Sequence, residues 1–477
     1  MGKYSLTSAL FLRLLALIYF IAFFSLAVQV RGLIGENGIL PYALALQRYQ
    51  ELIGFDAFWI APSLFWFIHD DFVLVAACVL GCIYAGLLFF KLYARTSLVI
   101  MFVLYLSLAH AAQVFLNFQW DTLLLEAGFL AIFLSRPSNY IVWLYRWLIF
   151  RLRFLSGISK IVSGDPTWAS LTAVVYYFEV QPLPNWVSWY AHHLPEWVLM
   201  TGSALTLVIE IIIPFMMLMP RRYRFFAAWA TIGIQLLIML TSNHNWVNLL
   251  TIALCLFLFD DQAVSRVLPA RLQTWLTGQS MAISRPGVLH NITVILVALI
   301  IVPVSMLQII EQISGSRTQG VIGQYARQVA AFHLVHPYHI FPTMPDKREE
   351  LVISGSDDGE HWQEYRFKYK PGDPGQRPPV VIPHQPRLDW MMWFVPLHPD
   401  FMLWFENFLD ALLVNSPEVV ALLETNPFPD APPRMIKIDL YEYYFSDETT
   451  RNTSGLWWTR KHLGPFPPLP FVQRVEP

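Results

Sequence analysis

The sequence predicts a polytopic α-helical membrane bundle of about eight to ten transmembrane helices, followed by a small β-rich, β-sandwich-like extramembrane domain with a helical insertion. Composition predicts the bundle, because 56% of the 477 residues are hydrophobic and only 14% are charged. Soluble chains carry about 25% charged residues. The second domain is predicted because, beyond about residue 308, apolar runs shorten while prolines and charges return. We therefore expect two domains, 1–308 and 309–477.

A helix needs roughly 20 apolar residues to cross a bilayer. The segments that approach this length with few charges are Ala9–Val30, Phe72–Phe90, Ser97–Phe115, Leu123–Leu134, Tyr140–Val162, Trp197–Leu218, Phe225–Leu240, Val247–Phe259 and Ile292–Leu307. Leu123–Leu134 and Val247–Phe259 are short, which favours spans that are tilted, partly re-entrant or buried by neighbouring helices.

The distribution of lysine and arginine predicts the orientation, because basic residues favour cytoplasmic loops. With Lys3 inside, the inward loops are Lys91–Arg95, Arg136, Pro220–Arg224 and Asp260–Arg285, and each carries basic residues. An odd number of crossings then places the C-terminal domain outside. We expect an integral membrane protein with an extracytoplasmic C-terminal domain, in a bacterial inner membrane or, in a eukaryote, in the endoplasmic reticulum with that domain lumenal.

Alternating residues predict strands in the C-terminal domain. Glu350–Lys370 reads as strand, turn and strand, because LVIS and YRFKYK alternate on either side of the turn signal Asp358-Gly359. Arg434–Phe445 alternates as a further strand. Asp400–Glu424 has helical spacing and predicts the helical insertion.

Several classes of function are disfavoured by the composition. The net charge of −2 shows no basic excess, so we expect no nucleic-acid partner. The three cysteines form no zinc pattern, and the adjacent side chains of His192 and His193 point apart, so we expect no metal. Hydrolase, zinc-peptidase and nucleotide-binding motifs are absent from the sequence, and no cofactor is predicted.

The chain is organised around FRLRFLSGISKIVSGDPTW, from Phe150 to Trp168. Arg153, Ser156 and Lys160 share one helical face inside this apolar segment. Ionisable groups at bilayer depth face a protein interior or a wet cavity. Snorkelling to the headgroups suits Arg151, and to a lesser extent Arg153. It suits Lys160 poorly, because apolar residues lie on both sides of this lysine.

Further polar residues converge on the outer side of the bundle under this topology. The expected membrane network comprises Trp120, Arg153, Ser156, Asp165, Glu210, Asn243 and Asn248. A lysine desolvated near carboxylates also suits a base, so Lys160 is a candidate catalytic residue, with Asp121, Glu126 and His193 as candidate assistants. The structural alternative is mutual pairing of these charges to hold the bundle together.

Long stretches of the chain resemble the lipase maturation factor family. They include FQWDTLLLEAGFLAIFL, RFLSGISKIVSGDPTW, QPLPNWVSWYAHHLPEW, SGSDDGEHWQEYRFKYKPGD and NPFPDAPPRMIKIDLYEYYF. The likeness runs from about residue 30 to about residue 460, and the length of 477 residues resembles a compact bacterial-type member.

This resemblance implies a non-enzymatic chaperone of the endoplasmic-reticulum type, which helps exported lipase-like proteins to fold or assemble in contact with the lipid bilayer. In this family the C-terminal domain is implicated in engaging the client. An exposed aromatic patch is therefore expected there. The client-binding candidates are Arg387, Asp389, Trp390, Trp393 and Phe394, with Trp457 and Trp458 as further aromatic candidates, although each of the aromatic residues suits a core equally well.

A second resemblance supplies the enzymatic alternative. SGISKIVSGDPTW is similar to the lysine-bearing segment of vitamin K-dependent γ-carboxylase-like membrane domains. Lys160 matches the second lysine of their motif, whereas Ser159 stands in place of the first and the tryptophan lies further away. The alternative is a membrane enzyme that acts on a lipid, a quinone or an exported peptide with Lys160 as base. A transporter is disfavoured, because no inverted repeat is evident.

Overall fold

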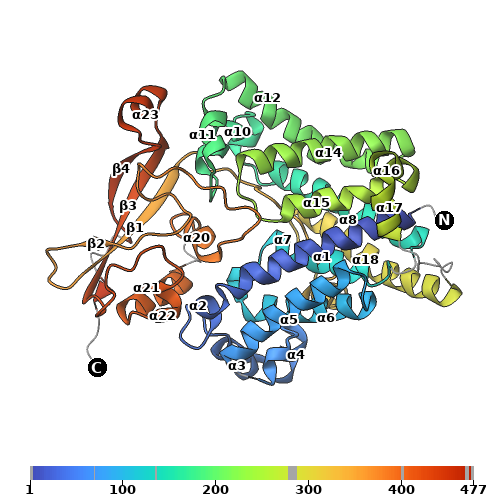
Figure 1. The fold of residues 1–477 in the computed structure, drawn as a ribbon, viewed down its shortest axis with the longest axis horizontal. Coiled ribbons are helices and arrows are strands. Elements are labelled where there is room, and N and C mark those ends of the chain that lie inside the picture. Colours follow the sequence, from blue (N-terminus) through green and yellow to red (C-terminus); the bar gives the residue numbers. More distant parts are fainter. Residues whose placement is uncertain are drawn as a thin grey trace.

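The computed structural model describes residues 4–68, 70–134, 137–277, 287–398, 402–467 and 472–473. The chain has two parts (Figure 1). The first part is a helical bundle, and the second part, called the sheet part, is a sheet with a few short helices. The sheet part lies at the end of the bundle that is far from the N-terminus (Figure 1). Lys3, Arg136 and Arg285, which contributed to the predicted orientation, lie outside the described residues, as does Asp400 at the start of the predicted helical insertion.

Every predicted apolar segment is helical, which confirms the polytopic bundle. Among the described residues, six helical segments are long and apolar enough to cross a membrane: α1 (Ser5–Ala27), α5 (Asp71–Phe89), α6 (Ala94–Ala111), the continuous stretch Glu196–Met217, α14 (Arg221–Thr241) and α18 (Val288–Ser314). The helix α8 (Asn139–Val162) has similar length but carries four basic side chains. The helices α7 (Gln119–Ala131) and α15 (Val247–Cys255) are shorter and largely buried.

The remaining helices of the first part are short. They are α2 (Val30–Ile34), α3 (Tyr42–Ile53), η1 (Gly54–Asp56), α4 (Ala57–Ile60), η2 (Leu64–Trp66), η3 (Gln113–Leu116), α9 (Pro166–Ala169), α10 (Ala173–Val180), α11 (Trp186–His192), η5 (Leu256–Leu258), α16 (Asp261–Val267), α17 (Ala270–Thr277) and α19 (Gly320–Ala331). The stretch Glu196–Met217 consists of α12 (Glu196–Leu207), η4 (Val208–Ile212) and α13 (Ile213–Met217).

Local signals explain where the central elements begin. The Ser138 hydroxyl accepts a hydrogen bond from the Ile141 amide and caps α8. The Asp165 carboxylate caps α9 in the same way, and Pro166 occupies the first turn, where a missing N–H costs nothing. At its far end α18 stops at Gly315, whose φ of 68° is the left-handed conformation that glycine adopts readily.

The sheet part is antiparallel, with strand order β2-β1-β3-β4, and β5 also pairs with β3. Its strands are β1 (Arg348–Ser356), β2 (Gln363–Glu364), β3 (Met435–Phe445), β4 (Trp458–Pro465) and β5 (Val472–Gln473). The helices of this part are α20 (Arg387–Met392), α21 (Met402–Leu413), α22 (Pro417–Val420) and α23 (Glu448–Ser454). The β-rich domain and its helical insertion are thus confirmed. The layer that packs with this sheet is supplied by helices, such as α21 against β3.

One predicted strand is much shorter than expected. YRFKYK leaves the sheet after Glu364, and Arg366 forms only an isolated bridge with Thr425. The Asp389 carboxylate explains this departure, because it accepts hydrogen bonds from the amides of Tyr369 and Lys370 at 2.7 and 3.0 Å and holds that segment at α20. The predicted domain boundary at residue 308 falls inside α18 and remains a prediction.

Candidate functional site

Lys160 lies at the centre of a buried charge cluster. Its Nζ lies 2.8 Å from Glu210 Oε2, and Glu210 Oε1 lies 3.0 Å from Arg153 Nη2. The ammonium also donates hydrogen bonds to the carbonyls of Ser156 at 3.1 Å and Ile340 at 2.7 Å. Only 3% of Lys160 is exposed. The structure therefore brings Arg153, Ser156 and Lys160 of α8 together with Glu210 of η4, and their function remains a prediction.

The approach of α8 to η4 depends on a glycine and on an irregular turn. Glu210 lies in η4, a π-helical turn, and such turns re-aim side chains within a helix. A Cβ at Gly157 would lie 2.8 Å from the Glu210 Cβ and 2.7 Å from Ile211. Glycine is required here because any larger side chain would push the two elements apart.

Arg151 forms a second buried ion pair, with Glu126. The other Glu126 oxygen accepts a hydrogen bond from the Tyr338 hydroxyl at 2.7 Å. Arg151 is fully buried, so the expectation that it snorkels to the headgroups is wrong. It is also wrong for Arg153, which pairs with Glu210. The expectation failed because the partner carboxylates lie on other helices, where local spacing does not reveal them.

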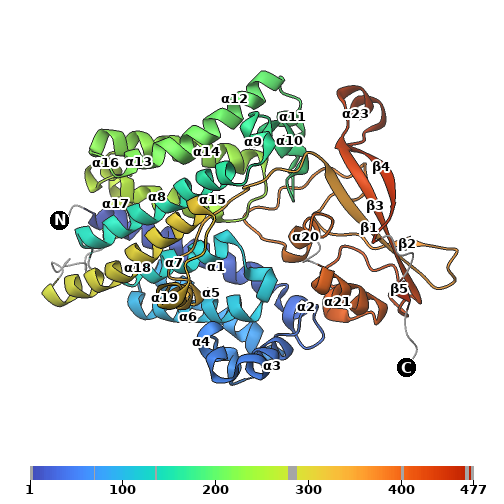
Figure 2. The same ribbon diagram turned by 180° about the vertical axis from the view of Figure 1, so that it is seen from behind.

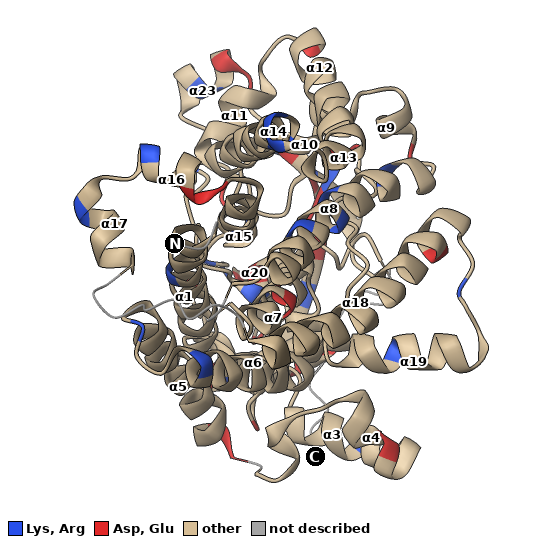
Figure 3. Ribbon diagram, turned by 90° about the vertical axis from the view of Figure 1, so that its right-hand side faces the viewer, with Lys and Arg blue, Asp and Glu red and all other residues tan. Residues whose placement is uncertain are grey.

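Asp121 anchors a third pair and joins the two parts of the molecule. Arg387 in α20 donates to both Asp121 oxygens, at 2.6 and 2.7 Å, and Tyr105 donates to Asp121 at 2.6 Å. The indole ring of the neighbouring Trp120 packs edge to face on Trp390, with centroids 5.0 Å apart. Viewed along the bundle, charged ribbon segments gather between α7, α8 and α20 (Figure 3).

A segment from the second part runs along α8 and contributes to these clusters. We call Leu334–Met344, which joins α19 to β1, the crossing segment (Figure 2). Besides Tyr338 and the Ile340 carbonyl, it offers the Pro342 carbonyl to Ser163 at 2.9 Å and the Met344 amide to Asp165 at 3.0 Å. The buried charges of α7 and α8 thus bind chain that precedes the sheet.

The other predicted residues lie apart from Lys160. His193 stacks on Trp189 with ring centroids 4.2 Å apart, which provides no contact with Lys160. Asn243 accepts a hydrogen bond from the Val381 amide at 2.8 Å and donates to the Pro379 carbonyl at 2.9 Å. Asn248 is buried in α15. The expected convergence therefore separates into several contacts spread over the end of the bundle that faces the sheet (Figure 1).

The client-binding candidates do not form an exposed patch. Arg387, Asp389 and Trp390 are 1%, 3% and 3% exposed. Trp393 is half-buried and donates to the Val180 carbonyl at 2.7 Å, and Phe394 packs against Phe118. Trp457 and Trp458 are also buried. The expected exposed patch is therefore wrong for these positions, because most of them pack against the helical bundle and Asp389 and Trp458 pack within the sheet part. Their role in client binding remains a prediction.

Sequence reasoning missed Arg348, at the start of β1. Its guanidinium donates to the carbonyls of Glu179, Gln181 and Pro182 at 2.8, 2.5 and 3.0 Å, and to Glu350 at 2.6 Å. Arg348 therefore fastens the sheet to the end of α10. The cluster KREE at the start of a predicted strand was the available signal, since charges rarely begin a buried strand.

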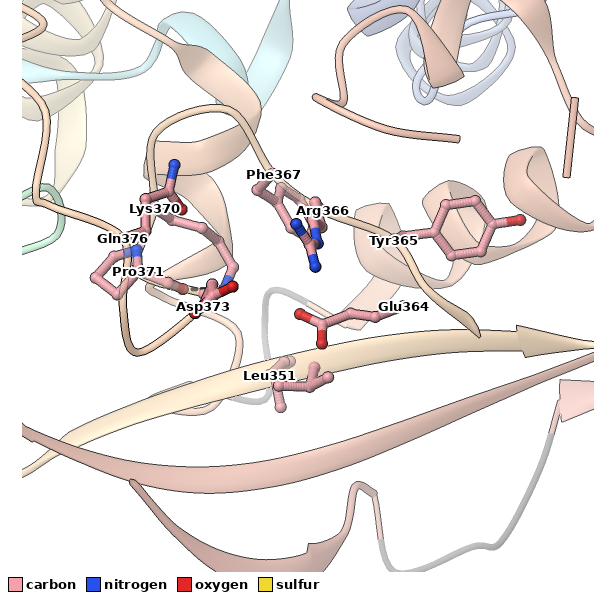
Figure 4. A pocket seen from close by; sticks show the side chains of 11 residues that line it. Leu351, Glu364, Tyr365, Arg366, Phe367, Lys370, Pro371, Asp373 and Gln376 are labelled. Atoms are coloured by element: carbon pink, nitrogen blue, oxygen red, sulfur yellow. Dashed lines mark hydrogen bonds between the residues drawn. The ribbon is translucent and has the colours of Figure 1, made fainter. Parts of the chain in front are cut away.

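Two further features of the described residues bear on ligand binding. In the part of the chain that the structure describes, no three ligand side chains gather to hold a metal. A shallow hollow lies beside β1, between Leu351 and the segment from Glu364 to Gln376 (Figure 4), and encloses only about 10 Å³. It occupies the space that the shortened second strand leaves, and it is far from Lys160 in the sequence and in the fold.

Comparison with known proteins gives consistent results. The family descriptions "Lipase maturation factor transmembrane domain" and "Lipase maturation factor C-terminal domain" match residues 6–266 and 334–468. Lipase maturation factor 1 of Mus musculus is 33% identical, over 98% of this chain and 88% of its own. Lipase maturation factor 2 is 32% identical in Xenopus tropicalis, over 99% and 83%, and 30% identical in Homo sapiens, over 98% and 83%. No solved structure matches.

These matches cover both the helical part and the sheet part. They agree with the resemblance noted in the sequence, and none of them supports the carboxylase-like alternative. The chain is an integral membrane protein that belongs to the lipase maturation factor family.

Proposed function

We propose that this chain is a membrane-anchored maturation factor that assists the folding or assembly of exported lipase-like proteins. The observation that carries the proposal is the family match across both parts of the chain, at about one third identity to lipase maturation factors 1 and 2. The client, and the extracytoplasmic position of the sheet part, belong to this proposal.

The buried polar contacts between the two parts support a structural role for the helical bundle, which holds the sheet part in place. Arg387 with Asp121 and Arg348 with the α10 carbonyls hold the sheet against the bundle. A folding factor benefits from a client-facing domain that is held at a fixed height above the membrane, where a newly exported chain emerges. The basic inward loops support the outward position of that domain.

The environment of Lys160 supports a structural role for this lysine. A catalytic base needs an unshared electron pair within reach of its substrate. The Lys160 ammonium is instead occupied by a carboxylate at 2.8 Å and by two carbonyls. We therefore infer that Lys160 balances the charge of Glu210, and that the chain acts on its client without covalent chemistry.

The test uses a cell that lacks the endogenous factor and expresses a secreted lipase. We expect the wild-type chain to raise the activity per milligram of secreted lipase, while an exported phosphatase is unchanged. An equal rise for both enzymes would indicate a general effect on export, and no rise for the lipase would refute the proposed function. Abundance of the chain in the membrane is measured in parallel.

The topology is tested separately by cysteine labelling. A single cysteine introduced at Thr459 in β4 should react with a membrane-impermeant maleimide in intact cells, whereas one at Arg222 should react only after lysis. The reverse pattern would contradict the extracytoplasmic position of the sheet.

A further inference from the structure

The strand β4 forms an edge of the sheet. Among the described residues it pairs only with β3. The Trp457 carbonyl accepts a hydrogen bond from the Ser446 amide at 3.1 Å and so points toward β3, whereas the Trp458 amide turns away from β3 and donates to the Pro374 carbonyl at 3.1 Å. Backbone groups alternate between the two edges of a strand. Arg460 and His462 therefore turn their N–H and C=O groups to the free edge.

This edge is accessible and carries a distinctive set of side chains. Arg460, Lys461, His462 and Leu463 are all exposed, and Tyr444 of the adjacent strand is 40% exposed. Arg460 donates to the hydroxyl of Tyr443, which lies opposite it on β3, at 3.1 Å, and this hydrogen bond fixes the position of the guanidinium on the exposed face of the edge. The free edge thus combines unpaired backbone groups, a run of basic residues and two exposed apolar side chains.

The basic side chains of β4 determine which kind of strand can pair with its free edge. Two copies of β4 would bring two basic runs together, and like charges on facing strands are destabilising. Charged residues on edge strands commonly prevent such self-association. The same charges attract a strand that carries carboxylates. The basic residues of β4 therefore disfavour pairing with a second copy of β4 and favour an acidic partner.

We propose that β4 binds an extended segment of the client polypeptide that alternates acidic and apolar residues, by adding it as a further strand at Arg460–His462. The inference rests on the proposed function and names the place and the mode of client contact. The backbone of the added segment supplies donors and acceptors for the groups that Arg460 and His462 turn to the free edge, and its carboxylates lie on the face of the sheet that carries Arg460, with its apolar side chains on the face that carries Leu463.

The first test measures binding of a short fluorescein-labelled peptide of alternating glutamate and valine to the full chain in detergent, by fluorescence anisotropy. His462→Pro removes the N–H that faces the free edge and leaves the bonds to β3 in place. His462→Ala is the matched control for loss of the imidazole. We expect His462→Pro to weaken binding about tenfold and His462→Ala to change it little. Equal binding by both variants would overturn the proposal.

The second test remains decisive even if the proline variant fails to fold. Wild-type protein should bind the glutamate peptide at least about tenfold more tightly than a lysine and valine peptide. The double variant Arg460→Glu, Lys461→Glu should reverse this preference. An unchanged preference would overturn the proposal, as would a wild-type dimer in light scattering that His462→Pro cannot form, since the occupant would then be a second copy.

The lipase assay separates this inference from the proposed function. Loss of lipase maturation in Arg460→Glu, Lys461→Glu, with normal membrane abundance, supports β4 as the client site. If the wild-type chain matures the lipase and this variant matures it equally well, β4 is not the client site and the proposed function stands. If the wild-type chain itself has no effect on lipase, the proposed function fails whatever the peptide binds.

Discussion

Arg387 in α20 and Asp121 in α7 are far apart in the sequence, yet the guanidinium donates to both carboxylate oxygens, at 2.6 and 2.7 Å. Both side chains are fully enclosed, and the Phe115 carbonyl accepts a third hydrogen bond from Arg387 at 2.9 Å. A buried pair of this geometry is costly to break, because the remaining partner becomes an uncompensated charge. The pair therefore joins α20 to the bundle.

The first prediction concerns this joint. Arg387→Ala should lower the free energy of unfolding by about 3–5 kcal/mol, because it leaves Asp121 buried without its partner. The measurement is the midpoint of thermal unfolding in detergent, followed by tryptophan fluorescence. The double variant Asp121→Asn, Arg387→Gln removes both charges and should recover much of the loss. An Arg387→Ala midpoint equal to that of wild type would show that the joint contributes nothing.

The second prediction concerns Arg348. Arg348→Ala should speed hydrogen exchange in β1 and around residues 179–182, because the carbonyls there lose their donor. Arg348→Lys should give an intermediate rate, since an ammonium cannot reproduce the planar array of donors. The neighbouring Lys347→Ala is the control, because Lys347 is exposed and lies 4.0 Å from its acidic partner. Similar rates of hydrogen exchange in Arg348→Ala and Lys347→Ala would contradict the role of Arg348 in holding β1 against the end of α10.

The third prediction compares the partners at Glu210. This carboxylate contacts both Arg153 and Lys160, so Glu210→Gln leaves two buried cations without a partner and should destabilise the bundle more than Lys160→Met does. Lys160→Arg should retain membrane abundance and lipase maturation, because it keeps the charge. Abundance and thermal midpoint are measured for all three, with Glu196→Gln as an exposed control in α12. Loss of lipase maturation in Lys160→Arg at normal abundance would instead favour a lysine-specific chemical role.

The sequence predicted those features of the fold whose signals lie within a single helix or strand. Apolar length placed the helices, and alternation placed β1 and β3, because each signal lies within one element. The shared face of Arg153, Ser156 and Lys160 is also local, and the structure keeps it. The partners of Arg151 and Asp121 were missed because they come from the crossing segment and from other helices. The short second strand was missed for the same reason, because Asp389 draws YRFKYK away from the sheet.

The last prediction concerns pH and Asp389. Burial raises the pKa of Asp389 to about 6, even though the amides of Tyr369 and Lys370 and the charge of Lys370 oppose the shift. An aspartate in the unfolded chain has a pKa of about 3.9. The folded state therefore holds this proton more tightly than the unfolded state. The stabilising contribution is complete below about pH 4 and is lost as the pH rises through about 6.

Between about pH 4 and pH 6, the titration of Asp389 should lower the free energy of unfolding by about 2–3 kcal/mol. Asp389→Asn cannot titrate, so its stability should decline less than that of wild type between pH 4 and pH 7. The difference between the two unfolding curves isolates Asp389 from other groups that titrate nearby, such as His384, whose pKa burial lowers to about 4. Parallel curves for the two proteins would contradict the raised pKa. The expected result is convergence at low pH, divergence between about pH 4 and pH 6 and a constant separation above that range, because a protonated Asp389 and an asparagine carry the same charge.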